Sequence, residues 1–194
     1  MIRVAVVGDI GSGKSYVAKQ FGYPVFNADA AVIQLYKKNK KCFEKLKKIL
    51  PKYIISFPIN KKEISKAIID NKNNLKKIVK IIHPEVRVSM NNFLRKNKSK
   101  KIVVLDIPLR IENKINKKKD VLVFIDAKKK EINKRLKKRP NYNLKMFKKL
   151  KKLQLPLEVK KKESNFIIKN NFRISSIKKS VRILKKKILK KWKK

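Results

Sequence analysis

Apolar residues in this chain form short, nearly continuous runs, separated by longer segments in which they recur every three or four positions. The runs at residues 2–7, 102–107 and 121–125 are rich in β-branched side chains, as expected of strands buried on both faces of a sheet. Shorter runs at residues 24–27 and 166–168 predict two further strands. Strands that alternate with helical segments indicate an α/β fold with a parallel sheet covered by helices on both sides.

Helical periodicity fills most of the remaining chain. The spacing of apolar residues predicts helices over residues 14–21, 30–38 and 127–136, and over most of residues 42–93. The last segment contains Pro84, and proline both lacks a backbone N–H and disfavours the α region for the residue before it. We therefore expect a kink or a new helix there, with the preceding residue outside the α region.

The lysine-rich end of the chain keeps an apolar stripe at helical spacing, which predicts a closing helix rather than disorder. The stripe consists of Ile177, Val181, Leu184, Ile188 and Trp192.

The turn between the first predicted strand and the first predicted helix has a sequence with a specific chemical meaning. Residues 8–15 read GDIGSGKS, and this strand–turn–helix context is the one that a phosphate-binding P-loop requires. Glycines let the backbone amides turn toward an anion, and the following helix adds its positive N-terminal end. In such a loop Lys14 reaches the β- and γ-phosphates, and the Ser15 hydroxyl ligates Mg²⁺. We expect ATP and Mg²⁺ here, with the nucleotide also contacted by Gly11, Ser12, Gly13 and Tyr16.

In a parallel sheet, ligands bind beyond the carboxyl ends of the strands, and two aspartates follow predicted strands. Asp29 could accept or orient a hydroxyl proton during phosphoryl transfer, or it could cap a helix that begins at Ala30. Asp106 ends an apolar strand, so it could hold Mg²⁺ through water or simply cap the strand end.

His83 is the only histidine in the chain, which argues against a metal site built from several histidines. It could orient a substrate, or it could simply occupy the break in the helix before Pro84. Arg87 lies one helical turn further on and could reach a phosphate.

Arg135 and Arg139 are four residues apart at the end of a predicted helix, and on a helix such residues share a face. They could clamp a triphosphate and neutralise charge in the transition state, or they could belong to a solvated cationic surface. Arginine is scarce relative to lysine in this chain, so the pair favours the first interpretation.

The charge of the chain is extreme, because 57 Lys and Arg oppose 13 Asp and Glu in 194 residues and give a formal net charge of +44. Such an excess is typical of nucleic-acid binding. The lysine clusters are nevertheless spread along nearly the whole chain, which favours a compositional bias on solvated faces. We expect no specific nucleic-acid partner.

The remaining composition restricts the class of protein further. No stretch approaches the length of a membrane span, and Asp9 interrupts the N-terminal apolar run, unlike a secretory signal. The single cysteine, Cys42, excludes an internal disulfide and fits a reducing compartment. We expect a cytoplasmic protein without a membrane partner, monomeric or weakly oligomeric.

Motifs spread over nearly the whole chain stand in a fixed order. The P-loop at residues 8–15 is followed by Asn-Ala-Asp at 27–29, IHPEVR at 82–87, LDIPLRIE at 105–112 and a Q-x-P…K…N ending at 154–170. In this order they resemble the dephospho-CoA kinase family, whose versions read GGIGSGKS, DAD, HPxVR, PLLFE and Q-x-P…K…ADFVIDN. The P-loop alone is shared by many kinases, so the HP, PL-x-x-E and Q…N elements, in this order, single out the family.

The resemblance implies ATP-dependent phosphorylation of the ribose 3′-hydroxyl of dephospho-CoA, giving coenzyme A and ADP, on a nucleoside-monophosphate-kinase-like P-loop fold. It gives Asp29 the position of the base, and it places Arg139, with Arg135 nearby, among the arginines of a lid over the phosphates. The residues then expected to contact dephospho-CoA are Asp29, His83, Arg87, Pro108 and Leu109.

The resemblance also divides the chain, as one kinase domain, into three parts. The core would comprise residues 1–36, 97–137 and 159–194. A helical insertion at about residues 37–96 would receive dephospho-CoA, and a small lid at about residues 138–158 would close over ATP.

Four positions depart from the family pattern without removing a group that the reaction requires. Asp9 replaces a glycine beside the phosphates, and Tyr16 stands where threonine is common. Asn27 replaces the first acid of DAD, and Arg110 replaces a leucine. Two other functions use the same features: another small-molecule or nucleotide P-loop kinase, or a basic nucleic-acid-binding ATPase, which the scattered lysines disfavour.

Overall fold

The computed structural model describes residues 1–107, 120–140, 142–152 and 154–192. The chain divides into two compact units. The first comprises Met1–Asn27, Asn97–Tyr142 and Lys151–Lys194, and the second comprises Ala28–Lys96 and Asn143–Leu150.

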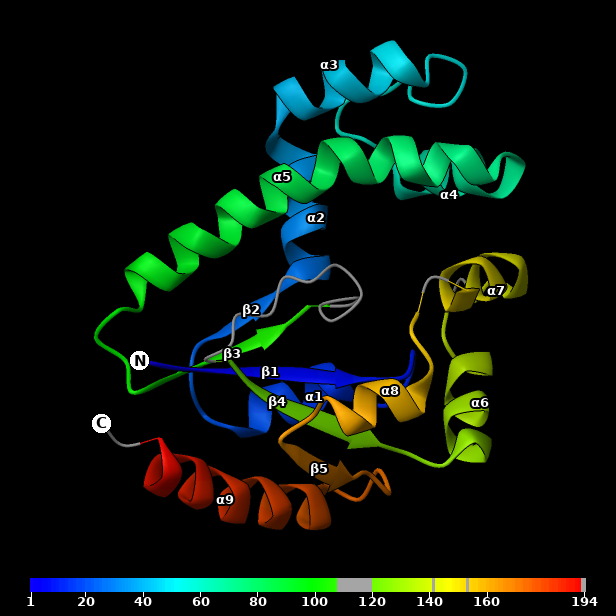
Figure 1. The fold of residues 1–194 in the computed structure, drawn as a ribbon. Helices are drawn as coiled ribbons and strands as arrows, with labels where there is room; N and C mark the ends of the chain where they lie inside the picture. Colours follow the sequence, from blue (N-terminus) through cyan, green and yellow to red (C-terminus); the bar gives the residue numbers. More distant parts are fainter. Residues whose placement is uncertain (108–119, 141, 153, 193–194) are drawn as a thin grey trace. The chain divides into compact units, whose positions relative to one another are not determined.

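The first unit is built on a five-stranded parallel sheet with the strand order β2-β3-β1-β4-β5 (Figure 1). The central strand β1 is flanked by β3 and β4, so that Val6 lies opposite Asp106 on one side and Val123 on the other. The predicted α/β fold with a parallel sheet is confirmed. The strands are β1 (Ile2–Gly8), β2 (Val25–Asn27), β3 (Ile102–Asp106), β4 (Asp120–Asp126) and β5 (Phe166–Lys169).

Helices cover this sheet because its strands are apolar on both faces, and every residue of β3 is buried. In Figure 1, α1 lies behind β1 and α8 in front of it, and both helices contact that strand. The helix α9 packs beside α1 and β5. The helices of this unit are α1 (Lys14–Gln20), α6 (Lys129–Lys137), α8 (Leu157–Lys162) and α9 (Ile174–Lys191).

The apolar stripe predicted for the closing helix forms the edge of the core. Ile177, Val181, Leu184 and Ile188 are buried against α1 and the sheet, and Trp192 packs partly buried against the same cluster. The remaining positions of α9 are dominated by lysine, so the segment is a helix with one buried face, as its periodicity predicts.

The second unit is helical and has its own apolar core. The long helix α5 contacts α2, α3 and α4, and the side chain of Lys149 in α7 donates to the carbonyl oxygens of Ile68 and Ile69 at 2.7 and 2.6 Å. The helices are α2 (Ala28–Lys38), α3 (Lys40–Ile49), α4 (Lys61–Asp70), α5 (Lys72–Lys96) and α7 (Leu144–Lys152), whose last two residues belong to the first unit.

No new helix starts at Pro84, because α5 runs through it, and the expectation that His83 leaves the α region is wrong. A proline inside a helix costs about 3 kcal/mol. Ile78 and Ile82, on the turns before it, are buried in the core of the unit, and burying such a side chain contributes about 1.5–3 kcal/mol. Packing of these residues offsets the local penalty.

In the described part of the chain, no helix combines the length and the apolar character needed to cross a bilayer.

Two isoleucines of α9 provide a matched test of this packing. Ile188 is fully buried, whereas Ile183 is 46% exposed on the opposite side of the same helix. We expect Ile188→Ala to lower the free energy of unfolding by about 2–5 kcal/mol, because it leaves a cavity in the core. Ile183→Ala should change it by no more than about 0.5 kcal/mol. Equilibrium urea unfolding measures both, and equal losses would contradict the packing of α9.

Candidate active site

The P-loop joins β1 to α1 through a backbone that only glycine accommodates at its last turn. Gly13 caps α1 in the left-handed conformation, with φ 88° and ψ 18°. A Cβ atom at this position would collide with the side-chain amide of Asn170. The positive φ angles of Gly11 and Gly13 turn the loop into the N-terminus of α1, which is the arrangement that binds phosphate.

Asn170 holds this loop from the carboxyl end of β5. Its side-chain amide donates to the carbonyl oxygen of Ser12 at 2.7 Å, and its side-chain oxygen accepts from the amide of Phe172 at 2.8 Å. Its own backbone amide donates to Asp126 at the end of β4 at 2.6 Å. Because Asn170 is only 4% exposed, these bonds replace water and fix the loop to two strands.

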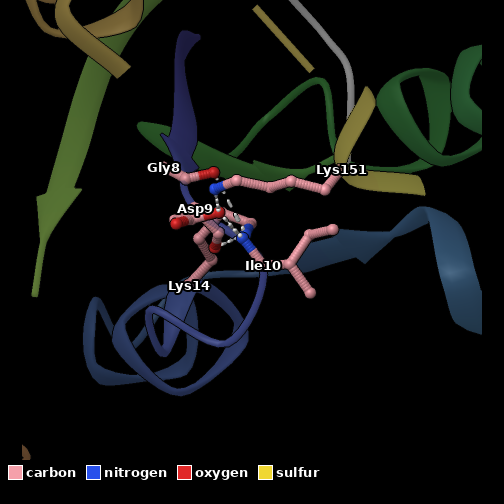
Figure 2. A network of polar contacts seen from close by, with 5 residues as sticks. All are labelled: Gly8, Asp9, Ile10, Lys14 and Lys151. Carbon is pink, nitrogen blue, oxygen red and sulfur yellow. Dashed lines mark hydrogen bonds and ion pairs between the residues drawn. The ribbon is translucent and has the colours of Figure 1, made fainter. Parts of the chain in front are cut away.

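Lys14 lies inside the curve of the loop (Figure 2). Its ammonium group donates to the carbonyl oxygens of Asp9 at 2.6 Å and Gly8 at 3.4 Å. The Asp9 carboxylate accepts from the amide of Ile10 at 2.7 Å and forms an ion pair with Lys151, near the end of α7. The predicted phosphate-binding lysine thus donates to two carbonyl oxygens of the loop, one of them that of Asp9.

Asp106 ends β3 beside the strand that leads into the P-loop. It is 2% exposed, and its carboxylate accepts a hydrogen bond of 2.6 Å from the side-chain amide of Asn27, its neighbour on β2. An aspartate at position 27, as in the family's DAD, would place a second carboxylate there. The amide donates instead, so this departure from the family pattern is matched to Asp106.

Arg135 belongs to α6, next to the P-loop. Its guanidinium carbon lies 4.5 Å from the ring centroid of Phe172, a cation–π geometry. Phe172 adopts a positive φ of 61° at the turn after Asn170. The helix α6 ends at Lys137, so Arg139 lies exposed in the following loop, and the prediction that both arginines share a helical face is wrong.

Three predicted substrate residues belong to the second unit. Asp29 lies exposed within the first turn of α2, which begins at Ala28, so the alternative that it caps a helix from Ala30 is wrong. Burial, and then the positive charge of Arg87 four residues later in α5, lower the pKa of His83. Its imidazole is therefore neutral at pH 7.

The other predicted residues lie as follows. A Cβ atom at Gly11 would lie 3.0 Å from the side chains of Ile132 and Leu136 in α6. Ser15 and Tyr16 lie exposed in the first turn of α1. Pro108 and Leu109 lie outside the described residues. Among the residues that the structure describes, no three His, Cys, Asp or Glu side chains gather as metal ligands.

A family model for dephospho-CoA kinase matches residues 2–176. The chain belongs to the dephospho-CoA kinase family. It is 35% identical over 170 residues to the dephospho-CoA kinase of Bartonella quintana, which covers 85% of this chain and 87% of that protein. It is 30% identical over 185 residues to that of Zymomonas mobilis, covering 94% of each. The family predicted from the order of the motifs is confirmed, and the protein is a kinase.

Solved structures show the same fold. The Thermus thermophilus protein TT1252 superposes with a TM-score of 0.79 at 24% identity, over 96% of this chain and 97% of that one. A dephospho-CoA kinase from Campylobacter jejuni superposes with a TM-score of 0.64 at 22% identity, over 96% of each chain. The five-stranded sheet and its helices therefore have the same fold as these two solved structures.

Three residues of this neighbourhood have no role in the predictions from sequence. Asn170 appears there only as the last residue of a family-like motif, whereas Phe172 and Lys151 have no signal, because one aromatic residue and one lysine do not stand out in this chain. Only their contacts with the P-loop and Arg135 show where they act.

Asn170 and its neighbour provide a matched test of P-loop support. We expect Asn170→Ala to lower the free energy of unfolding by about 1–3 kcal/mol, because it leaves the Ser12 carbonyl and the Phe172 amide without their partner. It should also raise the dissociation constant for ATP several-fold, on the order of 1 kcal/mol of lost binding. Asn171→Ala, at an exposed site, should leave ATP binding unchanged. Titration calorimetry and urea unfolding measure both effects, and equal ATP affinities would exclude this role for Asn170.

Proposed function

We propose that this kinase transfers the γ-phosphoryl group of ATP to the ribose 3′-hydroxyl of dephospho-CoA, giving coenzyme A and ADP. The observation that carries this proposal is a glycine-turned P-loop, with Lys14 inside it, on a chain matched by the dephospho-CoA kinase family model over residues 2–176. Phosphoryl transfer needs positioning and charge stabilisation more than covalent participation by the protein, and the P-loop supplies both.

ATP binds along the P-loop from Gly11 to Tyr16. The Lys14 ammonium group exchanges the carbonyl oxygens of Gly8 and Asp9 for phosphate oxygens, which are stronger acceptors because they are charged. Arg135 is held over Phe172, and a Cβ atom at Gly13 would lie 3.4 Å from that ring, so this side of the nucleotide site combines a cation with an aromatic face. Arg139 contributes a second cation from the loop after α6.

The oxygen donors near the P-loop fit Mg²⁺. This ion binds through one or two protein oxygens together with phosphates and waters, and it prefers hydroxyl and carboxylate ligands. Ser15 provides a hydroxyl at the start of α1, and Asp106 provides a carboxylate at the end of the neighbouring strand β3. When bound, Mg²⁺ neutralises charge on the transferring phosphoryl group.

Asp29 accepts or orients the proton of the 3′-hydroxyl. It follows β2 directly in the chain, at the start of α2, where its charge also interacts favourably with the helix dipole. His83 and Arg87, one turn apart on α5, bind dephospho-CoA, with a neutral imidazole as a hydrogen-bonding group and a guanidinium for phosphate. Pro108 and Leu109 complete this substrate set.

The parts of the chain divide this work. The helical segment at about residues 37–96 receives dephospho-CoA, and a lid at about residues 138–158 closes over ATP and excludes water. The protein works in the cytoplasm as a monomer or weak oligomer, and its partners are ATP and dephospho-CoA rather than a specific nucleic acid. The excess lysine then attracts polyanionic substrates without sequence recognition.

Mass spectrometry after incubation with ATP, Mg²⁺ and dephospho-CoA tests the reaction. We expect coenzyme A as product, and no comparable phosphorylation of nucleoside monophosphates or shikimate. Lys14→Ala and Asp29→Asn should each lower turnover by at least about a hundredfold, since they remove charge stabilisation and the proton acceptor. Lys19→Ala, an exposed lysine on the same helix as Lys14, is the control. Normal turnover of Asp29→Asn would exclude it as the base, and phosphorylation of another acceptor alone would overturn the proposed substrate.

A further inference from the structure

The P-loop of this kinase contains a negative charge that its family pattern does not have. Asp9 stands where the family has glycine, and its side chain is 13% exposed. The carboxylate accepts a hydrogen bond from the backbone amide of Ile10 and forms an ion pair with the ammonium group of Lys151 (Figure 2). An anion is thus already bound to one amide of a loop that must accept a triphosphate.

The electrostatic consequence concerns the whole loop. Lys14 brings one positive charge, and Asp9 brings one negative charge within the same turn, with the Lys14 ammonium on the Asp9 carbonyl. The Asp9 carboxylate and the phosphates of ATP carry like charges, and like charges a few ångström apart repel strongly where water is partly excluded. Without a further cation, Asp9 would cancel much of the attraction that Lys14 exerts on the phosphates.

Lys151 supplies that cation. It lies 142 residues from Asp9 in the sequence, so only the fold of the first unit brings the two side chains together. The side chain of Lys151 is 39% exposed, and the residue as a whole is half-buried. The next residue, Lys152, is exposed at the end of the helix. The ion pair with Asp9 therefore gives Lys151 a specific contact at the P-loop.

We propose that Lys151 is a positioning residue for ATP that acts through Asp9. Lys151 neutralises the Asp9 carboxylate and holds it on the Ile10 side of the loop, so that a P-loop with an aspartate in it still accepts a triphosphate. The inference rests on the proposed function only in taking ATP as the polyanion. It makes the Asp9–Lys151 pair a compensated unit: an Asp9 carboxylate without its lysine lowers nucleotide affinity, and Lys151 has no effect of its own once that carboxylate is removed.

A double-mutant cycle tests this coupling. Lys151→Met removes the charge and keeps an apolar stem, and Asp9→Asn removes the opposite charge and keeps an acceptor for Ile10. We expect Lys151→Met to raise the dissociation constant for ATP about tenfold, with kcat for coenzyme A formation changed by less than about twofold. Lys151→Arg should behave as the wild type, because the guanidinium also pairs with a carboxylate. Lys152→Met is the matched control and should leave the affinity unchanged.

The decisive measurement is Lys151→Met in the Asp9→Asn background, by titration calorimetry with ATP and Mg²⁺ and without dephospho-CoA. There the substitution should change the dissociation constant by less than about twofold. The same tenfold loss in both backgrounds would mean that Lys151 binds phosphate directly, and an unchanged affinity of Lys151→Met would mean that the pair has no role; either result overturns the proposal. Thermal unfolding of each variant separates these effects from loss of fold. If the wild type binds ATP but makes no coenzyme A, the proposed function fails while this cycle remains decisive.

Discussion

The hydrogen bond from Asn170 to the carbonyl oxygen of Ser12 is the contact on which the nucleotide site depends. It ties the turn after β1 to the end of β5, although β4 lies between these strands in the sheet. The same side chain leaves no room for a Cβ atom at Gly13, so support of the loop and its need for glycine have one cause. A parallel sheet makes this possible because all its strands deliver their carboxyl ends to one edge.

At that edge, acids are matched by specific donors rather than by the general excess of positive charge. Asn27 donates to Asp106, and Lys151 pairs with Asp9. In both places a departure from the family pattern is accommodated by the residue beside it: an amide next to a retained acid, and a lysine next to an added one. Substitutions in the motifs therefore have to be interpreted together with their contacts, because the effect of each residue depends on its partner.

The sequence predicts those parts of the fold whose signal is local. Buried β-branched runs predict β1, β3 and β4, and the stripe of apolar residues on α9 predicts which of its faces is buried. The new helix expected at Pro84 does not form, because the local penalty of proline is offset by the packing of Ile78 and Ile82, which a short window of sequence does not show.

The same distinction applies to the residues of the site. Spacing alone predicts the P-loop, because a strand, a glycine turn and a helix are contiguous in the chain. Spacing does not predict the contacts of Asn170 and Lys151, because their partners lie 158 and 142 residues away. The motif ending at Asn170 shows that the residue belongs to a family pattern, and only the bond to Ser12 gives the physical reason for it.

Scarce residues are the informative ones in a chain of this composition. With 57 Lys and Arg against 13 Asp and Glu, a lysine on the surface says little, whereas an acid has many possible partners and its chosen one is significant. Asp120 illustrates this at the opposite end of the sheet: its fully buried side chain pairs with Arg3 on the adjacent strand at 2.7 Å. Exposed ion pairs contribute little to stability, but removal of one partner of a buried pair leaves an uncompensated charge. The few acids at strand ends therefore show which of the many cations have a specific partner: Asp120 pairs with Arg3, and Asp9 pairs with Lys151.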